Sequence, residues 1–334
     1  MKKRMLLPVS LAVAALLFGV GCGKTEQNRE TPTPAPTRAE AKTDGYRIGT
    51  AVSDAYVDPA LTPTVPPQAI KAVGYEYEYD ALTYELVWSD EFEEDGLPDS
   101  TKWGYDVGGS GWGNNELQYY TEGDNVTVRD GMLVIEARQE EKGTKSYTST
   151  RLVSRGKGDW LYGRIEVRAK LPDGRGTWPA IWMLPTDWVY GDWPASGEID
   201  IMEHVGYDPG VVHGSIHTKS YYHSIGTQKT ATVRESSVSE EFHVYTLEWL
   251  PDKIMISMDG KVYFTFCPTT YRKEPTYTEW PFDERMHLLL NLAVGGDWGG
   301  VRGVDDTAFP QQLLVDYVRV YQSPEITALT EEEE

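Results

Sequence analysis

The sequence predicts an all-β fold, an antiparallel β-sandwich of the jelly-roll type. Short runs in which apolar and polar side chains alternate recur from Tyr84 onward, separated by Gly, Asp and Pro. In the clearest run, residues 161–171, Ile165 faces one way while Arg164 and Glu166 face the other. No window of useful length in this region has the period of a helix. Two-sided strands without helices are typical of sandwiches and jelly rolls.

The alternating runs also predict the individual strands and one turn. We expect strands at 133–137, 161–171, 242–250, 253–258, 261–266, 286–294 and 313–321. Asp259-Gly260 stands between two of these runs and is typical of a type I′ hairpin. We see no internal repeat.

Composition excludes some classes of function. The chain has 334 residues and a formal net charge of −21, which argues against nucleic acid as a partner because phosphate binding depends on Lys and Arg. An acidic surface suits a neutral substrate better. The 11 Trp and 21 Tyr residues supply flat amphipathic rings that could stack on sugars. Two cysteines, Cys22 and Cys267, are too few to indicate a disulfide framework.

The N-terminus indicates export. Residues 1–21 combine the basic Met1–Arg4 with an apolar stretch too short for a spanning helix, as in a signal peptide. Cys22 follows directly, and this arrangement resembles a bacterial lipoprotein signal, which implies a lipid anchor at Cys22 outside the cytoplasm, in the cell envelope. Gly19 stands where such signals prefer Leu, so a secreted protein cleaved by ordinary signal peptidase is the alternative.

Domain boundaries follow from changes in composition. We expect a Pro/Thr-rich extended linker at 22–44 and the β-domain at 84–323. An acidic C-terminal tail is expected at 324–334. The sequence leaves open whether the extension at 45–83 packs on the domain or continues the linker.

The domain is organised around an acidic stretch that spans 196–206. In an extended strand Glu198 and Asp200 share one face, but strict alternation would turn Glu203 toward the core. Burying an unpaired carboxylate is unfavourable. We therefore expect a one-residue β-bulge at Ile201-Met202 that returns Glu203 to the face of the other acids, since bulges are enriched beside active sites.

Three crowded carboxyls suit the cleavage of a glycosidic bond. Like charges raise one another's pKa, so one carboxyl can stay protonated while another stays ionised. Glycosidases need this division between an acid and a nucleophile or base. The alternative is a solvated acidic edge strand that discourages pairing with other chains. The interleaved Ile199 and Ile201 and the aromatic flanks favour a catalytic site.

Several aromatic, glycine-rich and acidic motifs occur over roughly 86–321, namely Gly197-Glu198-Ile199-Asp200-Ile201-Met202-Glu203, Val87-Trp88-Ser89-Asp90-Glu91-Phe92, Gly111-Trp112-Gly113-Asn114-Asn115-Glu116, Gly176-Thr177-Trp178-Pro179-Ala180, His213-Gly214-Ser215-Ile216-His217 and Val294-Gly295-Gly296-Asp297-Trp298. With these motifs the chain resembles glycoside hydrolase family 16, in its laminarinase (endo-β-1,3-glucanase) branch. The resemblance implies two curved sheets with a concave substrate cleft.

The resemblance also implies roles for the acids. Glu198 would be the nucleophile, Glu203 the general acid/base, and Asp200 a hydrogen-bond partner that holds Glu198 in place. The reaction would retain anomeric configuration, for which the two working carboxyls lie about 5–5.5 Å apart. The polysaccharide would be bound by Asn114, Trp178, Trp182, His217 and Trp298, although core packing is an alternative for Trp182 and Trp298.

Two metals need separate treatment. Family members often carry a structural Ca²⁺, and the matching positions are Glu91, Gly131 and Asp316, with oxygen-only ligation that suits calcium. The alternative is that these acids cap loops. His213 and His217 superficially suggest zinc, but we expect none, because no cysteine or helix makes them converge. No cofactor is expected for catalysis.

Several functions stay open at the level of sequence. The first is a retaining endo-β-1,3-glucanase acting on laminarin-like or mixed-linkage glucan, as a monomer. Another specificity of the family, such as galactan hydrolysis or transglycosylation, is the second. The third is a non-catalytic glucan-binding lipoprotein, which the presence of Glu198, Asp200 and Glu203 disfavours.

Overall fold

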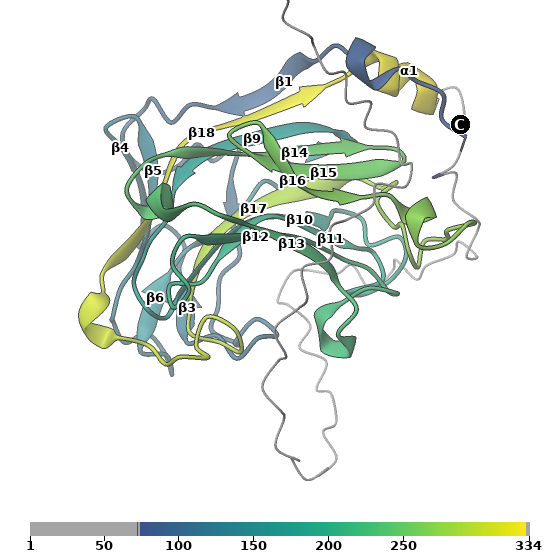
Figure 1. Ribbon diagram of the computed structural model, residues 1–334. Helices are drawn as coiled ribbons and strands as arrows, with labels where there is room; N and C mark the ends of the chain where they lie inside the picture. Colours follow the sequence, from purple (N-terminus) through teal and green to yellow (C-terminus); the bar gives the residue numbers. More distant parts are fainter. Residues whose placement is uncertain (1–71, 73, 332–334) are drawn as a thin grey trace, which may run out of the picture. The chain divides into compact units, whose positions relative to one another are not determined.

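A computed structural model describes residues 72 and 74–331, and this part of the chain is built from two large antiparallel sheets packed as two layers (Figure 1). Sheet A contains β1 (Glu85–Asp90), β4 (Val126–Arg129), β5 (Met132–Ala137), β9 (Gly163–Lys170), β14 (His243–Leu250), β15 (Lys253–Met258), β16 (Lys261–Phe266) and β18 (Gln311–Gln322). Its strand order is β16-β15-β14-β9-β18-β5-β4, with β1 also paired to β18. The predicted sandwich is confirmed.

Sheet B is the second layer. It contains β2 (Gly104–Tyr105), β7 (Arg151–Val153), β8 (Asp159–Trp160), β10 (Thr177–Pro185), β11 (Glu198–His204), β12 (Val211–His217), β13 (Lys229–Arg234) and β17 (Met286–Val294). The order is β13-β12-β11-β10-β17-β7-β2, and β8 also pairs with β17. The acidic strand β11 therefore lies inside the sheet, between β10 and β12, and is not an edge strand.

Short elements complete the described chain. β3 (Gln118–Tyr120) and β6 (Tyr147–Ser149) form a small parallel pair. The helical elements are η1 (Tyr79–Ala81), η2 (His223–Ile225), η3 (Ser236–Ser239), η4 (Pro268–Thr270), η5 (Asp306–Ala308) and α1 (Pro324–Glu331). None of the helices among residues 72 and 74–331 has the length and apolarity needed to cross a bilayer.

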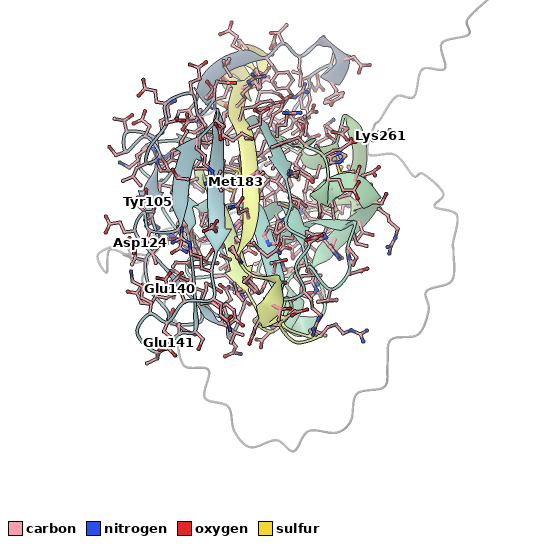
Figure 2. All side chains as sticks on the ribbon, turned by 90° about the vertical axis from the view of Figure 1, so that its left-hand side faces the viewer. Tyr105, Asp124, Glu140, Glu141, Met183 and Lys261 are labelled. Carbon is pink, nitrogen blue, oxygen red and sulfur yellow. The ribbon has the colours of Figure 1, made fainter. Side chains whose placement is uncertain are left out.

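The core lies between the two sheets. In β9 every second residue is buried, including Ile165 and Val167, as the alternation predicts. Leu288 and Leu290 of β17 are buried in the same cluster from sheet B. Met183 of β10 lies within the packed side chains in Figure 2. Removing these apolar surfaces from water is the main force that holds the sheets together.

The strand β17 is buried along all nine of its residues, on both faces. Leu289, which points away from the main core, packs in a second apolar cluster with Val153 and Leu184. Trp182, Trp188 and Trp193 pack against this cluster. Side chains with large aromatic surfaces therefore cover part of the outer face of sheet B, the face to which the acids belong.

The predicted hairpin joins β15 to β16. Asp259 has a φ of 49° and Gly260 a φ of 74°, and two successive positive values are the mark of a type I′ turn. Asp259 also accepts a hydrogen bond from the backbone N–H of Val244 at 2.9 Å. The turn residues thus match their backbone conformation, as the sequence indicates.

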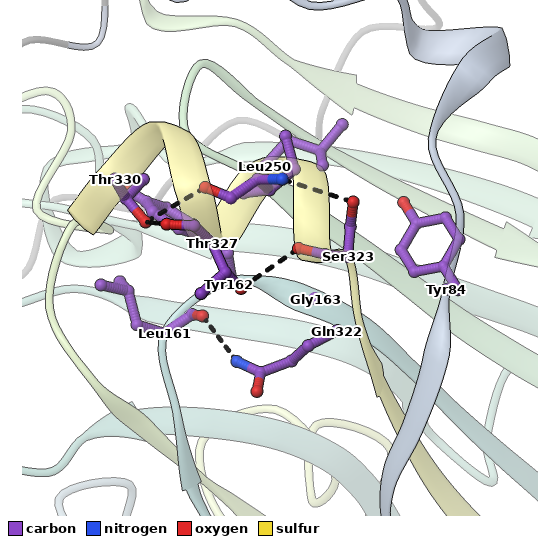
Figure 3. Close-up of a pocket in the computed structure, with 10 residues that line it drawn as sticks. Tyr84, Leu161, Tyr162, Gly163, Leu250, Gln322, Ser323, Thr327 and Thr330 are labelled. Carbon is purple, nitrogen blue, oxygen red and sulfur yellow. Dashed lines mark hydrogen bonds between the residues drawn. The ribbon is translucent and has the colours of Figure 1, made fainter. Parts of the chain in front are cut away.

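Both ends of the described chain dock on sheet A. Residues 74–83, whose order the sequence left open, pack through Tyr77 and Tyr79 against the main core. The segment expected as an acidic tail contains the helix α1, which begins after Ser323. Ser323 caps this helix, because its Oγ accepts a hydrogen bond from the N–H of Ile326 at 3.4 Å. Figure 3 shows the small pocket between α1, Tyr84 and Gln322 at this junction.

Candidate active site

The bulge expected at Ile201-Met202 is present. Asp200 pairs with Ser215 and Glu203 with His213, so two residues of β11 stand opposite the single residue Gly214 of β12. The register against β10 shifts at the same point. Ile201 and Met202 are both buried in the core. The bulge therefore returns Glu203 to the face that carries Glu198 and Asp200.

A glycine admits the start of this strand. Gly197 has a φ of 87°, which side chains with a Cβ rarely adopt. A Cβ at this position would lie 2.8 Å from both Pro281 and Phe282. This glycine allows the chain to turn into β11 directly before Glu198.

An indole N–H bonds to each of the two outer carboxyls. Trp193 Nε1 donates to Glu198 Oε2 at 2.8 Å, and Trp178 Nε1 donates to Glu203 Oε1 at 3.0 Å. Trp193 comes from the loop before β11 and Trp178 from β10. Each of the two outer carboxyls thus has its own indole donor.

Asp200 lies between these groups and is only 2% exposed. It shares a hydrogen bond with Glu198. His217 on β12 approaches both acids, with Nε2 3.3 Å from Asp200 Oδ2 and 3.8 Å from Glu198 Oε1. Glu198, Asp200 and His217 therefore form a compact buried group.

Burial raises the pKa of all three carboxyls, and the charge on Asp200 adds to the effect at Glu198 and Glu203. Burial and the Asp200 charge raise the pKa of Glu198 to about 8, and burial raises the pKa of Asp200 to about 7. The same two causes raise the pKa of Glu203 well above its ordinary value. His217 and the Trp193 N–H favour ionisation of Glu198.

Aromatic side chains surround the Glu203 end of the site. Trp178 meets Trp298 edge-on, with ring centroids 5.4 Å apart, and His213 meets Trp298 at 4.9 Å. Asn114 reaches this group through its backbone, because its carbonyl accepts a hydrogen bond from the N–H of Asp297 at 2.7 Å. The structure thus brings Asn114, Trp178 and Trp298 together.

Trp182 occupies the middle of the outer face. Its Nε1 donates to Asn291 Oδ1 at 2.7 Å, and its ring packs on one side of the Arg151 guanidinium at 4.7 Å. Trp112 packs over the same guanidinium at 4.8 Å. Arg151 is 6% exposed and forms an ion pair with Asp106. The cation between two indoles holds both rings in fixed orientations.

Sequence reasoning missed Trp193 and Arg151. Trp193 lies in a loop without periodicity, and its only signal was its position five residues before Glu198. Arg151 occurs in a short strand whose three residues are all buried, which gave no indication of a charged centre. The partners of Arg151 come from segments distant in sequence.

The histidines take different positions. His204 is buried on the core side, as expected, and burial lowers its pKa to about 4. Neither of its ring nitrogens has a hydrogen-bond partner among the described residues, so the expectation that it is a satisfied histidine was wrong. His213 packs on Trp298 while His217 contacts the acids, so these two do not converge.

The residues predicted for calcium lie away from the acids. Glu91 follows β1 and forms a two-pronged ion pair with Arg319, at 2.8 and 2.7 Å. Asp316 lies in an irregular part of β18 and pairs with Arg168. Gly131 lies in the turn between β4 and β5. Each carboxylate is thus engaged by an arginine. Cys22 is outside the described residues.

One face of sheet B carries three carboxyls and several indoles. Paired carboxyls of this kind are the catalytic groups of hydrolases that cleave carbohydrates, and this is the class that the fold and the site indicate. A family model, "Glycosyl hydrolases family 16", matches residues 113–318. The chain belongs to this family. A second model, "Beta-glucan synthesis-associated protein SKN1/KRE6/Sbg1", matches residues 11–188.

Individual relatives agree with the family. A β-glucanase of Rhodothermus marinus is 56% identical over 256 residues, which are 75% of this chain and 89% of that protein. The X-ray structure of the laminarinase from Rhodothermus marinus has a TM-score of 0.71 and 55% identity, covering 73% of this chain and 99% of that one. A non-specific endo-β-1,3(4)-glucanase of the family, described with 1,3-β-D-cellobiosyl-glucose at its active site, has a TM-score of 0.69 and 46% identity, covering 78% and 99%.

Proposed function

We infer that this protein is a retaining endo-β-1,3-glucanase that hydrolyses laminarin-like or mixed-linkage glucan. The observation that carries this function is the bulged strand β11, which places Glu198, Asp200 and Glu203 on one face. The identity to the Rhodothermus marinus β-glucanase and laminarinase supports the substrate class. The indoles of Trp178, Trp182 and Trp298 supply surfaces on which glucose rings stack.

The geometry supports a division of labour between the two glutamates. Glu203, whose pKa burial raises well above its ordinary value, protonates the glycosidic oxygen while the Glu198 carboxylate attacks the anomeric carbon. The bond from the anomeric carbon to the leaving oxygen breaks as the glycosyl-enzyme ester forms. Glu203, now ionised, takes a proton from water, and the hydroxide releases the sugar from Glu198. Asp200 holds Glu198 in place through their shared hydrogen bond.

The first test replaces the nucleophile. Glu198→Gln preserves the shape of the side chain but removes the attacking carboxylate, so hydrolysis of laminarin falls by at least about 1,000-fold while oligosaccharide binding persists. The exposed Glu241→Gln is the matched control and keeps full activity. Full activity of Glu198→Gln would refute the mechanism.

Stereochemistry provides the second test. Double displacement inverts the anomeric centre twice, so proton NMR of the first product shows the β-anomer. An initial α-anomer would exclude Glu198 as the nucleophile. Product lengths from laminarin, lichenan, curdlan and agarose, followed over time, define linkage preference and internal cleavage.

Transglycosylation is a second candidate, favoured by the match to β-glucan synthesis-associated proteins. The chemistry is the same, except that a sugar hydroxyl replaces water in the second step. Laminari-oligosaccharides at high concentration would then yield products longer than the substrate, whereas a hydrolase produces only shorter ones.

We also propose that Glu91, Gly131 and Asp316 hold a structural calcium ion. The donors are oxygens, as calcium requires, but Glu91 and Asp316 must exchange Arg319 and Arg168 for the ion. Calcium would then raise the melting temperature over that in EGTA, and Glu91→Gln would abolish the difference. Equal melting temperatures of the unmodified protein would refute the site.

For the whole chain we propose a monomer, anchored in the cell envelope by a lipid on Cys22. The basic and apolar residues before Cys22 support this proposal. Cys22→Ser would release the protein from the membrane fraction, and size-exclusion chromatography with light scattering measures the oligomeric state. Release of the unmodified protein as well would favour secretion.

A further inference from the structure

Glu198, Asp200 and His217 have the donor atoms of a metal site. One ligand atom of each residue lies within 4.8 Å of the other two, and within the described part of the chain this is the only such cluster of three His, Cys, Asp or Glu side chains. The residues come from the neighbouring strands β11 and β12, where Glu198 pairs with His217 and Asp200 with Ser215. The site is therefore built on rigid backbone.

The oxygens of Glu198 and Asp200 that face His217 are the ones that accept no hydrogen bond from any further side chain among the described residues. Glu198 Oε2 accepts the Trp193 N–H, which leaves Oε1 turned toward His217 Nε2. Asp200 Oδ2 is buried, lacks a hydrogen-bond partner and also faces His217 Nε2. An unpartnered buried carboxylate oxygen is unfavourable, and a cation would satisfy it.

The spacing fits a small tetrahedral ion. With bonds of about 2.0–2.2 Å, neighbouring ligand atoms around zinc lie roughly 3.4 Å apart. The distances from His217 Nε2 are 3.3 Å to Asp200 and 3.8 Å to Glu198. Small side-chain rotations would bring three ligands to zinc and leave a fourth position for water. An imidazole ligand favours zinc over calcium or magnesium, which prefer oxygen donors.

We propose that Glu198, Asp200 and His217 bind zinc, or a similar divalent transition metal, as a reversible inhibitor of the glucanase. The ion occupies the carboxylate that must attack the substrate, so metal and glucan exclude each other. His217 Nδ1 has no hydrogen-bond partner in the described part of the chain to orient the ring. Loss of the hydrogen bond that orients a metal-binding histidine weakens metal binding by about 10–100-fold. We therefore expect micromolar affinity, suited to an inhibitor and not to a resident cofactor.

Binding is measured directly, so that it does not depend on the proposed activity. Isothermal titration of the purified protein with ZnCl₂ gives one site with a micromolar Kd, whereas MgCl₂ gives no heat. His217→Gln weakens zinc at least tenfold. His213→Gln removes a histidine from the same strand that contacts Trp298 instead of the acids, and it changes the Kd less than twofold. Circular dichroism confirms that both variants fold.

Two results would overturn the site: no zinc binding by the unmodified protein, or equal weakening by both substitutions. Kinetics on laminarin add an independent test that needs no variant. Zinc raises KM without lowering kcat, and EDTA reverses the effect. A fall in kcat at unchanged KM would place the metal elsewhere. Failure of the glucanase assay itself would leave the calorimetric result intact, which separates this inference from the proposed function.

Discussion

At the scale of single residues, the two indole N–H groups of Trp193 and Trp178 distinguish the two glutamates. An N–H donor stabilises an ionised carboxylate more than a protonated one, so each bond lowers the pKa of the carboxyl that accepts it. Glu198 must be ionised to attack and Glu203 must be protonated to donate. The bond from Trp193 therefore favours the reactive state, whereas that from Trp178 opposes it and orients the acid.

Substituting these tryptophans should move different limbs of the pH profile. Trp193→Phe raises the pKa of Glu198, so the acidic limb of kcat/KM moves to higher pH. Trp178→Phe raises the pKa of Glu203, so the basic limb moves to higher pH. Each shift is about one to two pH units, since a hydrogen bond to a charged group is worth roughly 1.5–3 kcal/mol. Profiles of both variants on laminarin check this. If both substitutions moved the same limb, the assignment of roles would be wrong.

At the scale of elements, the bulge decides which side chains of β11 reach the site. Before it, Ile199 faces the core and Asp200 the acidic face, and after it Glu203 faces outward and His204 inward. One extra residue thus exchanges the faces of everything that follows it in the strand. The pattern of buried residues explains why the bulge could be predicted, because the alternative would bury a carboxylate beside the isoleucines.

Deleting Met202 should leave Glu203 on the acidic face. Without Met202, Glu203 follows the inward Ile201, so regular alternation turns it outward, opposite His213 as before. We expect hydrolysis of laminarin to remain detectable while the melting temperature falls, because a buried methionine is lost from the core. Met202→Leu keeps the bulge and the core volume, so it retains activity and most of the stability. Activity assays and calorimetry on both variants test this, and a folded but inactive deletion variant would contradict it.

At the scale of the whole molecule, the two ends of the described chain are joined on sheet A. The hydroxyls of Tyr77 and Tyr79 donate to Asp252 and Glu248, and Lys253 lies 4.5 Å from the ring centroid of Tyr79. Thr83 donates twice to Glu325, from its N–H at 3.2 Å and its hydroxyl at 2.7 Å. These contacts link residues more than 160 positions apart, on the sheet that does not carry the acids.

This arrangement predicts that stability and catalysis can be changed separately. The double substitution Tyr77→Phe and Tyr79→Phe removes both hydrogen bonds from tyrosine hydroxyls to carboxylates, so the melting temperature falls by about 2–6 °C. The kcat on laminarin is unchanged, because these residues belong to the layer away from Glu198 and Glu203. Tyr271→Phe, at an exposed tyrosine, leaves both quantities unchanged. A loss of kcat in the double variant would show that the two layers are coupled.

The sequence alone determined the sandwich, most strand positions, the hairpin at Asp259-Gly260 and the bulge that gathers the three acids. These features follow from alternation, turn chemistry and the cost of burying charge, all of which act between residues close in the chain. Only the tertiary structure showed that Trp193 bonds to Glu198, that Arg151 lies between Trp112 and Trp182, and that His217 completes a cluster with two acids. Those contacts depend on how loops and strands from separate segments pack in three dimensions, and no local pattern encodes that packing.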